Sequence, residues 1–175
     1  MTIKTIFLDR DGVINKETGY LHKIEDFKFI NGVFEACQHY EQLGYKIVIV
    51  TNQTGISRGH YSEDDFRNIT DWMITQFNKN NIQILDTFHC PHIPGSGCNC
   101  RKPKPGMLLE AKKKYNINML ESWMIGDSER DIEAANLAGV RNTILLKAEN
   151  RIDKINSKAT FVINSILQSQ EIILE

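Results

Sequence analysis

The feature that most constrains the fold is a repeated alternation between short apolar runs and longer amphipathic stretches. The short runs are rich in β-branched residues and end at polar residues or glycine, which is typical of buried parallel strands. They span residues 5–9, 46–51, 86–90, 122–126 and 142–146. Because strands that alternate with helices build parallel sheets covered on both faces, we predict a Rossmann-like α/β fold with a doubly wound parallel sheet.

Two of the intervening stretches have the spacing of amphipathic helices. Apolar side chains recur every three or four residues over 33–43, and Gly44 follows as a typical stop. A second apolar stripe over 66–77 lies behind Ser62, a residue suited to cap the first helical turn. Further helices are predicted after Pro105-Gly106 and from Asp131 to Gly139, and the tail from Lys147 is predicted to add an edge strand over 159–163 and a last helix.

The composition fits a single globular domain over residues 1–175. The chain is 41% hydrophobic and 25% charged, which suits a packed core and excludes a mainly disordered protein. Its net charge of -1 provides no general field for nucleic acid or an anionic membrane, so an anionic ligand must be met by a few placed groups. No apolar run approaches the roughly 20 residues of a membrane span. We therefore expect a cytoplasmic monomer without nucleic-acid or membrane partners.

Carboxylates follow two of the predicted strands, at the edge where an open α/β sheet binds its ligands. Asp9 and Asp11 come after the first run, and Asp127 comes after the fourth. Neighbouring carboxylates can bind Mg²⁺, attack phosphorus or transfer a proton. Each short motif taken alone is also compatible with an ordinary turn.

The other strand ends carry groups that suit phosphate. Thr51 follows the second run and is succeeded by Asn52, Gln53 and Thr54, whose hydroxyl and amide groups can hold phosphate oxygens. Arg101 and Lys102 follow the third run and can supply counter-charge, although such cations are more often solvated. Acids, a hydroxyl, amides and a lysine together are the groups needed for phosphoryl transfer through an aspartyl intermediate.

Three of the four cysteines lie in one loop, whereas Cys37 belongs to a predicted helix core. The loop, residues 90–100, brings together Cys90, His92, Cys98 and Cys100. Four soft or borderline ligands without an open position fit a structural Zn²⁺. A disulfide between two of these cysteines would leave the third thiol unpaired, so zinc is the favoured interpretation. The loop leads directly into Arg101 and Lys102, so a metal there would also position these cations.

In chain order, these motifs resemble the four motifs of the haloacid dehalogenase superfamily. They are Asp9-x-Asp11-Gly12, Thr51, Lys102 and Gly126-Asp127-Ser128-x-x-Asp131. The resemblance covers residues 5–146 and implies a Mg²⁺-dependent phosphatase with Asp9 as the nucleophile and Asp11 as the general acid and then base. It also implies that Thr51 and Lys102 stabilise the phosphoryl group. The implied Mg²⁺ ligands are Asp9, the backbone carbonyl of Asp11, and Asp127, while Asp131 positions its neighbours.

Two phosphatase families of this superfamily are similar to the whole set of motifs. Asp9-Arg-Asp-Gly, Thr51-Asn-Gln-Thr-Gly-Ile, the cysteine loop and Arg101-Lys-Pro-Lys-Pro-Gly-Met resemble both the heptose 1,7-bisphosphate 7-phosphatases and the histidinol-phosphate phosphatases. Segments 15–21 and 55–59 resemble the heptose enzymes, whereas the short gap inside the cysteine loop resembles the histidinol-phosphate enzymes. The first family implies removal of a 7-phosphate in heptose biosynthesis for surface glycans such as lipopolysaccharide or capsule. Histidinol-phosphate hydrolysis and a non-catalytic, zinc-stapled phosphate-binding module remain as alternatives.

A sugar bisphosphate would need contacts beyond the phosphate that is cleaved. We expect the planar fork of Arg101 to face the second phosphate while Lys102 faces the first. The spacing of the motifs leaves no room for a separate cap domain, so the site is expected to be open. Glu17, Thr18, Gly19 and Tyr20 are predicted to meet the sugar hydroxyls, and Asn52, Gln53 and Thr54 to line the floor.

Overall fold

The computed structural model describes residues 1–147 and 156–174, so residues 148–155 of the tail and residue 175 lie outside the described part. Within that part the sheet has six strands in the order β3-β2-β1-β4-β5-β6, and all neighbours are parallel. The strands are β1 (Thr5–Leu8), β2 (Lys46–Asn52), β3 (Ile84–Cys90), β4 (Trp123–Gly126), β5 (Asn142–Leu146) and β6 (Phe161–Ile163). The predicted doubly wound parallel sheet is confirmed, with β6 as the predicted edge strand.

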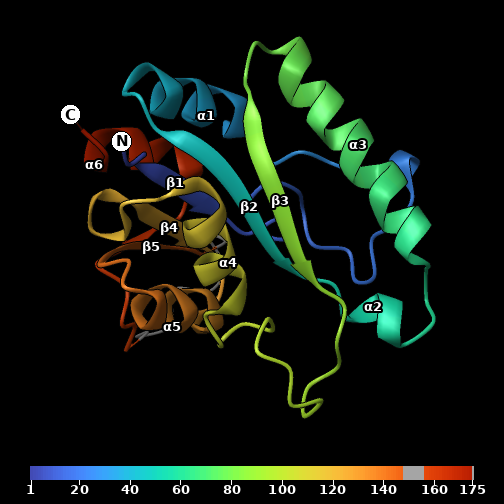
Figure 1. Ribbon diagram of the computed structural model, residues 1–175. Coiled ribbons are helices and arrows are strands. Elements are labelled where there is room, and N and C mark those ends of the chain that lie inside the picture. The colour runs from blue at the N-terminus through green and yellow to red at the C-terminus, as the bar shows by residue number, and fades with distance from the viewer. Residues whose placement is uncertain (148–155, 175) are drawn as a thin grey trace.

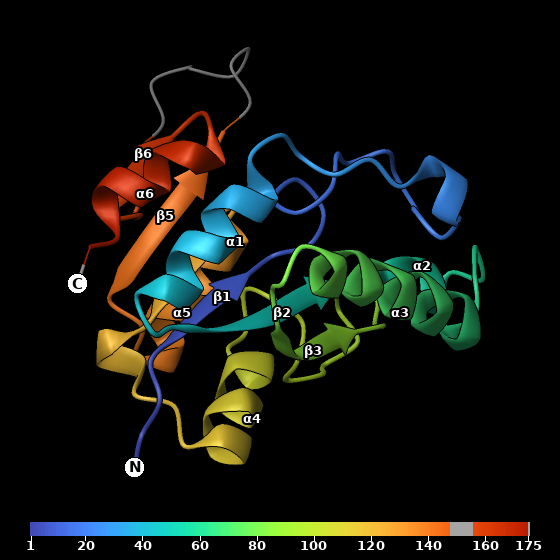
Figure 2. The same ribbon diagram turned by 90° about the horizontal axis from the view of Figure 1, so that it is seen from above.

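Helices cover both faces of this sheet (Figures 1 and 2). Figure 2 shows α1 and α4 on opposite sides of the strands. The helices are α1 (Val33–Gln42), α2 (Thr54–Ser57), α3 (Glu63–Lys79), α4 (Gly106–Tyr115), α5 (Glu129–Ala138) and α6 (Ser169–Ile172), with 3-10 turns η1 (Ile24–Asp26), η2 (Met119–Glu121) and η4 (Ile166–Gln168). The described helices include none that is both long and apolar enough to cross a membrane.

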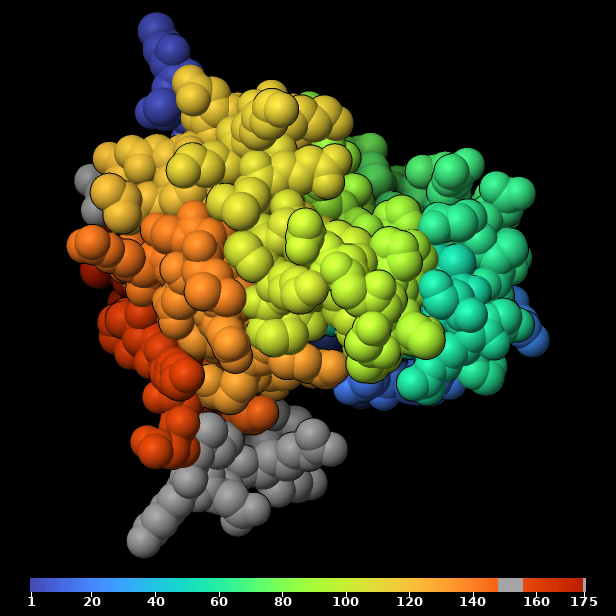
Figure 3. Space-filling view, turned by 60° about the horizontal axis from the view of Figure 1, so that its bottom comes forward, coloured from blue at the N-terminus to red at the C-terminus, as the bar shows by residue number. Residues whose placement is uncertain are grey.

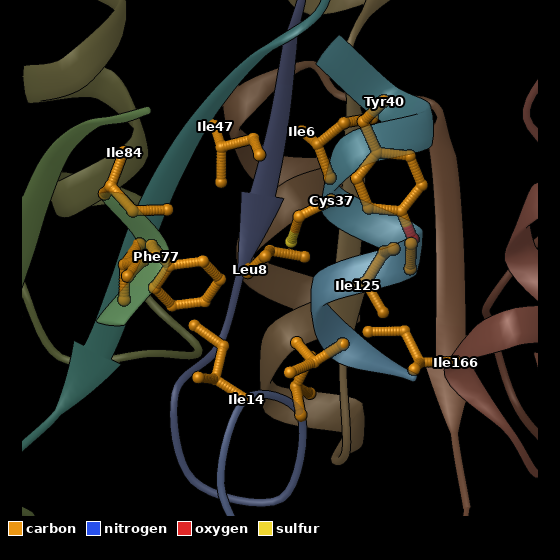
Figure 4. Packing of buried hydrophobic residues seen from close by; sticks show 14 of the residues in the cluster. Ile6, Leu8, Ile14, Cys37, Tyr40, Ile47, Phe77, Ile84, Ile125 and Ile166 are labelled. Carbon is orange, nitrogen blue, oxygen red and sulfur yellow. The ribbon is translucent and has the colours of Figure 1, made fainter. Parts of the chain in front are cut away.

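Each central strand divides its side chains between two cores. Ile6 and Leu8 of β1 belong to a core shared with α1, α3 and α6, whereas Phe7 belongs to a second core shared with α4 and α5. Figure 4 shows the first core, where Cys37 and Tyr40 of α1 pack over the strands. Because both faces are buried, the strands are continuous apolar runs, as the sequence predicted.

The helix ends follow local hydrogen bonds. Ser62 caps α3 through a capping box with Asp65, and Gly44 follows α1 at φ 82°. The predicted start of α5 at Asp131 was two residues late, because Ser128 and Asp131 form a capping box ahead of Glu129. The four-residue helix α2 was not predicted.

Candidate functional site

The carboxyl ends of β1, β2 and β4 meet at the lower edge of the sheet in Figure 1, where the order of the strands reverses. Figure 3 shows this edge, with the chain around the cysteine loop (yellow-green) between α2 (turquoise) and α5 (orange). A cavity of about 240 Å³ opens here. Its lining consists of Asp9, Asp11, Glu17, Asn52, Lys102, Asp127, Ser128, Arg130, Asp131 and Lys147.

Lys102 is a buried cation of this cavity, 2% exposed, and Arg130 and Lys147 also line it. Its Nζ lies 2.9 Å from Asp9 Oδ1 and 2.6 Å from Asp131 Oδ1, and it donates to the carbonyl of Val50 at 2.7 Å. Burial alone would lower the pKa of Lys102, but Asp131 and Asp9 raise it above its ordinary value. The ammonium therefore stays charged at the end of β1, where it can neutralise an incoming phosphoryl group.

Asp9, Asp127 and Asp131 form an acidic group in which one oxygen of each lies within 4.8 Å of the others. Asp131 is already bound by protein groups, since its Oδ1 pairs with Lys102 and its Oδ2 accepts from Ser128 N at 3.1 Å. Asp9 and Asp127 are thus the two carboxylates of the group that can hold a divalent cation. Gly12 permits this approach, because a Cβ there would lie 2.2 Å from Asp127 Oδ2 and its φ is +83°.

The titration of this group also suits a cation. Burial raises the pKa of Asp9 well above its usual range, against the lowering effect of Lys102. Burial, followed by Asp131 and Glu17, raises the pKa of Asp127 to about 6. Crowded carboxylates with raised pKa values gain from a bound divalent cation, and oxygen ligands of this kind fit Mg²⁺.

The carboxylate of Asp11 turns away from the acidic group. It accepts from Arg10 Nη2 at 2.9 and 3.1 Å, from Asn15 Nδ2 at 2.9 Å and from Gln53 Nε2 at 3.1 Å. Arg10 is 1% exposed, and its guanidinium pairs with Asp11 while its backbone N donates to Asp9 Oδ1 at 2.8 Å. The side chain of Asp11 is therefore not in the metal-binding group, and the predicted metal ligand at this position is its backbone carbonyl.

The residues at the end of β2 and just after it are bound mostly by protein partners. Asn52 accepts from Lys102 N at 3.1 Å and donates to its carbonyl at 3.1 Å, which fixes the chain that carries the lysine. Thr51 is fully buried beside Gln53, and Thr54 accepts from Arg101 Nη1 at 2.6 Å. The predicted floor residues thus lie at the site, where they hold its parts in place.

A second cavity of about 330 Å³ adjoins the first. Its rim carries Arg58, Arg101 and Arg130, and in the described part of the chain no ion pair joins these three to a carboxylate. Burial, followed by the positive charges of Arg130 and Arg58, lowers the pKa of Arg101 from its ordinary value. Converging cations without carboxylate partners suit a polyanionic ligand. We name this cavity the arginine pocket.

The flap, residues 15–29, closes one side of the arginine pocket. Glu17, Gly19 and Tyr20 line it, whereas Thr18 is exposed on the flap outside the lining. The Tyr20 hydroxyl accepts from Arg58 Nη1 at 2.5 Å, so α2 and the flap are tied together at the rim.

The cysteine loop brings its four predicted ligands into one cluster. The ligand atoms of Cys90, His92, Cys98 and Cys100 lie within 4.8 Å of one another, and all three cysteines are free thiols. Cys90 Sγ lies 3.7 Å from Cys98 Sγ and 3.4 Å from His92 Nδ1. Sulfur atoms around one tetrahedral Zn²⁺ lie about 3.8 Å apart, which the Cys90–Cys98 pair matches, whereas Cys90 Sγ and Cys100 Sγ lie only 2.7 Å apart. The residue types of the cluster, three thiols and an imidazole, are those that Zn²⁺ prefers. Arg101 Nη1 also donates to the His92 carbonyl at 3.1 Å, which links the loop to the arginine pocket.

Four residues at the site were not found from the sequence. Arg10 is the unassigned position inside the first motif, and Tyr61 is an ordinary residue of the segment before α3. Arg58 and Arg130 lie in loops or helix starts, where nothing in the spacing says which way an exposed side chain points. Only their position beside recognised motifs could have suggested them.

Comparisons with known proteins agree with this geometry. The HAD-hydrolase-like family model matches residues 99–169. A D-glycero-alpha-D-manno-heptose-1,7-bisphosphate 7-phosphatase of Photorhabdus laumondii is 43% identical over 95% of this chain and 97% of its own. A D-glycero-beta-D-manno-heptose-1,7-bisphosphate 7-phosphatase of Vibrio cholerae is 44% identical over 95% of this chain and 94% of its own.

Solved structures show the same fold. The D,D-heptose 1,7-bisphosphate phosphatase from B. bronchiseptica, complexed with magnesium and phosphate, superimposes with a TM-score of 0.87 and 29% identity. The match covers 97% of each chain.

Proposed function

Because the chain belongs to the haloacid dehalogenase-type heptose 1,7-bisphosphate 7-phosphatase family, we propose that it removes the 7-phosphate of a D-glycero-D-manno-heptose 1,7-bisphosphate. As a member of that family it is a phosphoric monoester hydrolase. The observation that carries the choice of substrate is the arginine pocket beside the acidic group. One cavity can hold the phosphate that is cleaved, and the other can hold a second phosphate of the same molecule.

Asp9 is the proposed nucleophile. Its carboxylate lies at the end of β1, 2.9 Å from Lys102 Nζ, so the lysine can neutralise phosphoryl charge as the carboxylate attacks phosphorus. The attack forms an aspartyl phosphate and releases the sugar oxygen. Asp9, Asp127 and the backbone carbonyl of Asp11 would hold Mg²⁺, which when bound supplies further charge neutralisation.

Asp11 is the proposed general acid and base. It protonates the departing sugar oxygen and later takes a proton from the water that hydrolyses the aspartyl phosphate. Its distance from the acidic group suits this role, because a carboxylate committed to a metal would be a poor proton carrier. Thr51 is proposed to donate a hydrogen bond to the phosphoryl group.

The second phosphate is proposed to bind in the arginine pocket. Arg101 is the central contact, since its position is fixed by Thr54 and by the His92 carbonyl. Arg58 and Arg130 add two more guanidinium groups on either side. Glu17, Gly19 and Tyr20 are then placed to meet sugar hydroxyls, with Thr18 nearby on the flap.

Zn²⁺ is proposed as a structural ion held by Cys90, His92, Cys98 and Cys100. Its role would be to fix the loop that carries Arg101 and Lys102, because the loop has little apolar content of its own. The proposed reaction would serve the biosynthesis of activated heptose for surface glycans. The monomeric state and the cytoplasmic location stay predictions.

A substrate panel tests this proposal. Phosphate release is measured with both anomers of the heptose bisphosphate, heptose 7-phosphate, histidinol phosphate and p-nitrophenyl phosphate, and ³¹P NMR identifies which phosphate leaves. We expect the bisphosphate to be preferred over histidinol phosphate by more than about tenfold in kcat/KM, or about 1.4 kcal/mol of transition-state binding. Preference for histidinol phosphate, or loss of the 1-phosphate, would overturn the assignment. Absence of hydrolysis by Mg²⁺-loaded protein would support the non-catalytic alternative.

A further inference from the structure

Gln53 hydrogen-bonds both to Asp11, the proposed proton donor to the leaving oxygen, and to Thr51, the proposed hydrogen-bond donor to the phosphoryl group. Its Nε2 donates to Asp11 Oδ2 at 3.1 Å and to Thr51 Oγ1 at 2.8 Å, while its Oε1 accepts from the Tyr61 hydroxyl. Gln53 is 2% exposed. A primary amide has two donor hydrogens, and both are directed to protein acceptors here. The polar groups of the side chain are therefore bound by protein partners, and Gln53 also lines the arginine pocket.

We propose that Gln53, oriented by Tyr61, is a positioning residue that holds Asp11 for proton transfer to the leaving oxygen and sets the direction of the Thr51 hydrogen bond. This inference rests on the roles proposed above for Asp11 and Thr51. It adds a residue pair that lines the arginine pocket and acts on Asp11 and Thr51 through its own hydrogen bonds.

The direction of the hydrogen bonds follows from the chemistry of the partners. The carboxylate of Asp11 can only accept when it is ionised, so the amide group that faces it must be the NH₂ group. The second hydrogen of that NH₂ group goes to Thr51 Oγ1. Because the Thr51 oxygen accepts from Gln53, the hydroxyl keeps its own hydrogen for another acceptor. A phosphoryl oxygen is such an acceptor.

The hydroxyl of Tyr61 fixes the orientation of the Gln53 side-chain amide. This hydroxyl donates to Gln53 Oε1, so the carbonyl side of the amide is held away from Asp11 and Thr51. A reversed amide would place its carbonyl oxygen against the carboxylate, where two acceptors repel each other. Tyr61 is itself buried and packs closely, since a Cβ at Gly55 would lie 2.1 Å from its ring. Tyr61 also lines the arginine pocket, but its hydroxyl is taken up by Gln53 Oε1.

The position of Asp11 is fixed from three sides, by Arg10, Asn15 and Gln53. Gln53 is the member of this set that also reaches Thr51, so it fixes the acid relative to the phosphoryl site. A shift of about 1 Å in a general acid is enough to slow proton transfer, because the reaction requires hydrogen-bond distance to the leaving oxygen.

Two substrates separate this role from a general structural one. A sugar oxygen needs a proton as it leaves, whereas p-nitrophenolate leaves without one. The ratio kcat/KM covers the steps up to release of the alcohol and excludes hydrolysis of the aspartyl phosphate. Misplacement of Asp11 should therefore lower kcat/KM for a sugar phosphate much more than for p-nitrophenyl phosphate.

The experiment compares Gln53→Met, Tyr61→Phe, the double variant and Asp11→Asn with both substrates. We expect Gln53→Met to lower kcat/KM about tenfold or more for the sugar phosphate and less than about threefold for p-nitrophenyl phosphate. Tyr61→Phe should show a smaller loss with the same selectivity, and should add nothing in the Gln53→Met background. Tyr40→Phe is the matched control, because it also removes a buried tyrosine hydroxyl, one bound to Ser169, and should leave both activities unchanged.

Two results would overturn the inference, provided that Asp11→Asn still discriminates between the substrates. One is an equal loss on both substrates for Gln53→Met, and the other is an additive effect of Tyr61→Phe in the Gln53→Met background. If Asp11→Asn also fails to discriminate, the proposed role of Asp11 is wrong. If Gln53→Met does not fold, the substrate selectivity of Tyr61→Phe alone supports or refutes the role.

Discussion

Replacement of Arg101 by alanine tests the arginine pocket directly. The side chain is half-buried, and its Nη1 is held by Thr54 Oγ1 at 2.6 Å and by the His92 carbonyl at 3.1 Å. Its other guanidinium nitrogens are thus presented from a fixed position. We expect the substitution to weaken binding of the second phosphate in the transition state and to leave the acidic group intact.

The size of the effect can be worked from these contacts. A hydrogen bond to a charged group contributes about 1.5–3 kcal/mol, and partial exposure to solvent keeps the value for Arg101 near the lower half of that range. About 2 kcal/mol corresponds to about 30-fold in kcat/KM. Heptose 7-phosphate lacks the second phosphate, so its hydrolysis should fall less than about threefold.

The assay is steady-state phosphate release from the bisphosphate and from heptose 7-phosphate. Arg67→Ala is the control, because Arg67 is 70% exposed, pairs only loosely with Asp64 at 3.7 Å and does not line the pocket. Zinc content is measured alongside, since Arg101 also binds the chain at His92. Equal losses on the two substrates, with zinc retained, would refute the reasoning.

Three further perturbations address the other parts of the site. Asp9→Asn should abolish turnover while thermal unfolding stays close to that of the parent, and near-normal turnover would exclude an aspartyl phosphate on this residue. Removal of zinc by a chelator should lower the unfolding temperature and the activity together, and elemental analysis should find about one zinc per chain; a metal-free protein with disulfides would contradict this. The pKa of Asp127, raised to about 6 chiefly by burial, predicts that Mg²⁺ affinity measured by calorimetry rises as the pH increases from 5 to 7, since the ion needs the carboxylate. In the metal-free protein the same raised pKa stabilises the fold at low pH, and this contribution should be lost as the pH rises from about 4 through 6. A flat affinity profile would show that Asp127 is not a ligand.

The sequence was sufficient to predict an element where the local residue pattern and the overall fold favour the same structure. Residues 46–51 form a continuous apolar run, which predicts a strand buried on both faces. The structure agrees, because β2 divides its side chains between two cores. Ser62 was recognisable as a helix cap because its partner Asp65 is only three residues away. The clustering of the four predicted zinc ligands was equally readable, since these residues lie within eleven consecutive positions. In each case the decisive contacts are close in sequence or repeated along it.

The sequence was insufficient where a side chain chooses between partners that are distant in the chain. Gln53 follows Thr51 and Asn52 and was predicted to line the floor of the site, where it does line the arginine pocket, but the hydrogen bonds of its amide to Asp11 and Tyr61 could not be predicted. Arg58 and Arg130 converge on one pocket although 72 positions separate them, because α2 and α5 start at the same edge of the sheet. No sequence periodicity predicts that these two arginines lie close together, because their proximity depends on the order of the strands in the sheet.

The charges of the two cavities indicate why they lie side by side. Asp9, Asp127 and Asp131 outnumber the buried ammonium of Lys102, and the pKa values of Asp9 and Asp127 are raised. A divalent cation held by Asp9 and Asp127 would offset this negative charge and allow a phosphoryl group to approach Asp9. The arginine pocket carries three guanidinium groups, Arg58, Arg101 and Arg130, against the nearby carboxylate of Glu17, since Asp11 is already paired with Arg10. A phosphate dianion suits that positive charge. A bisphosphate of suitable length can place one phosphate in each cavity, and this supports the proposed sugar bisphosphate over histidinol phosphate, whose other end is cationic.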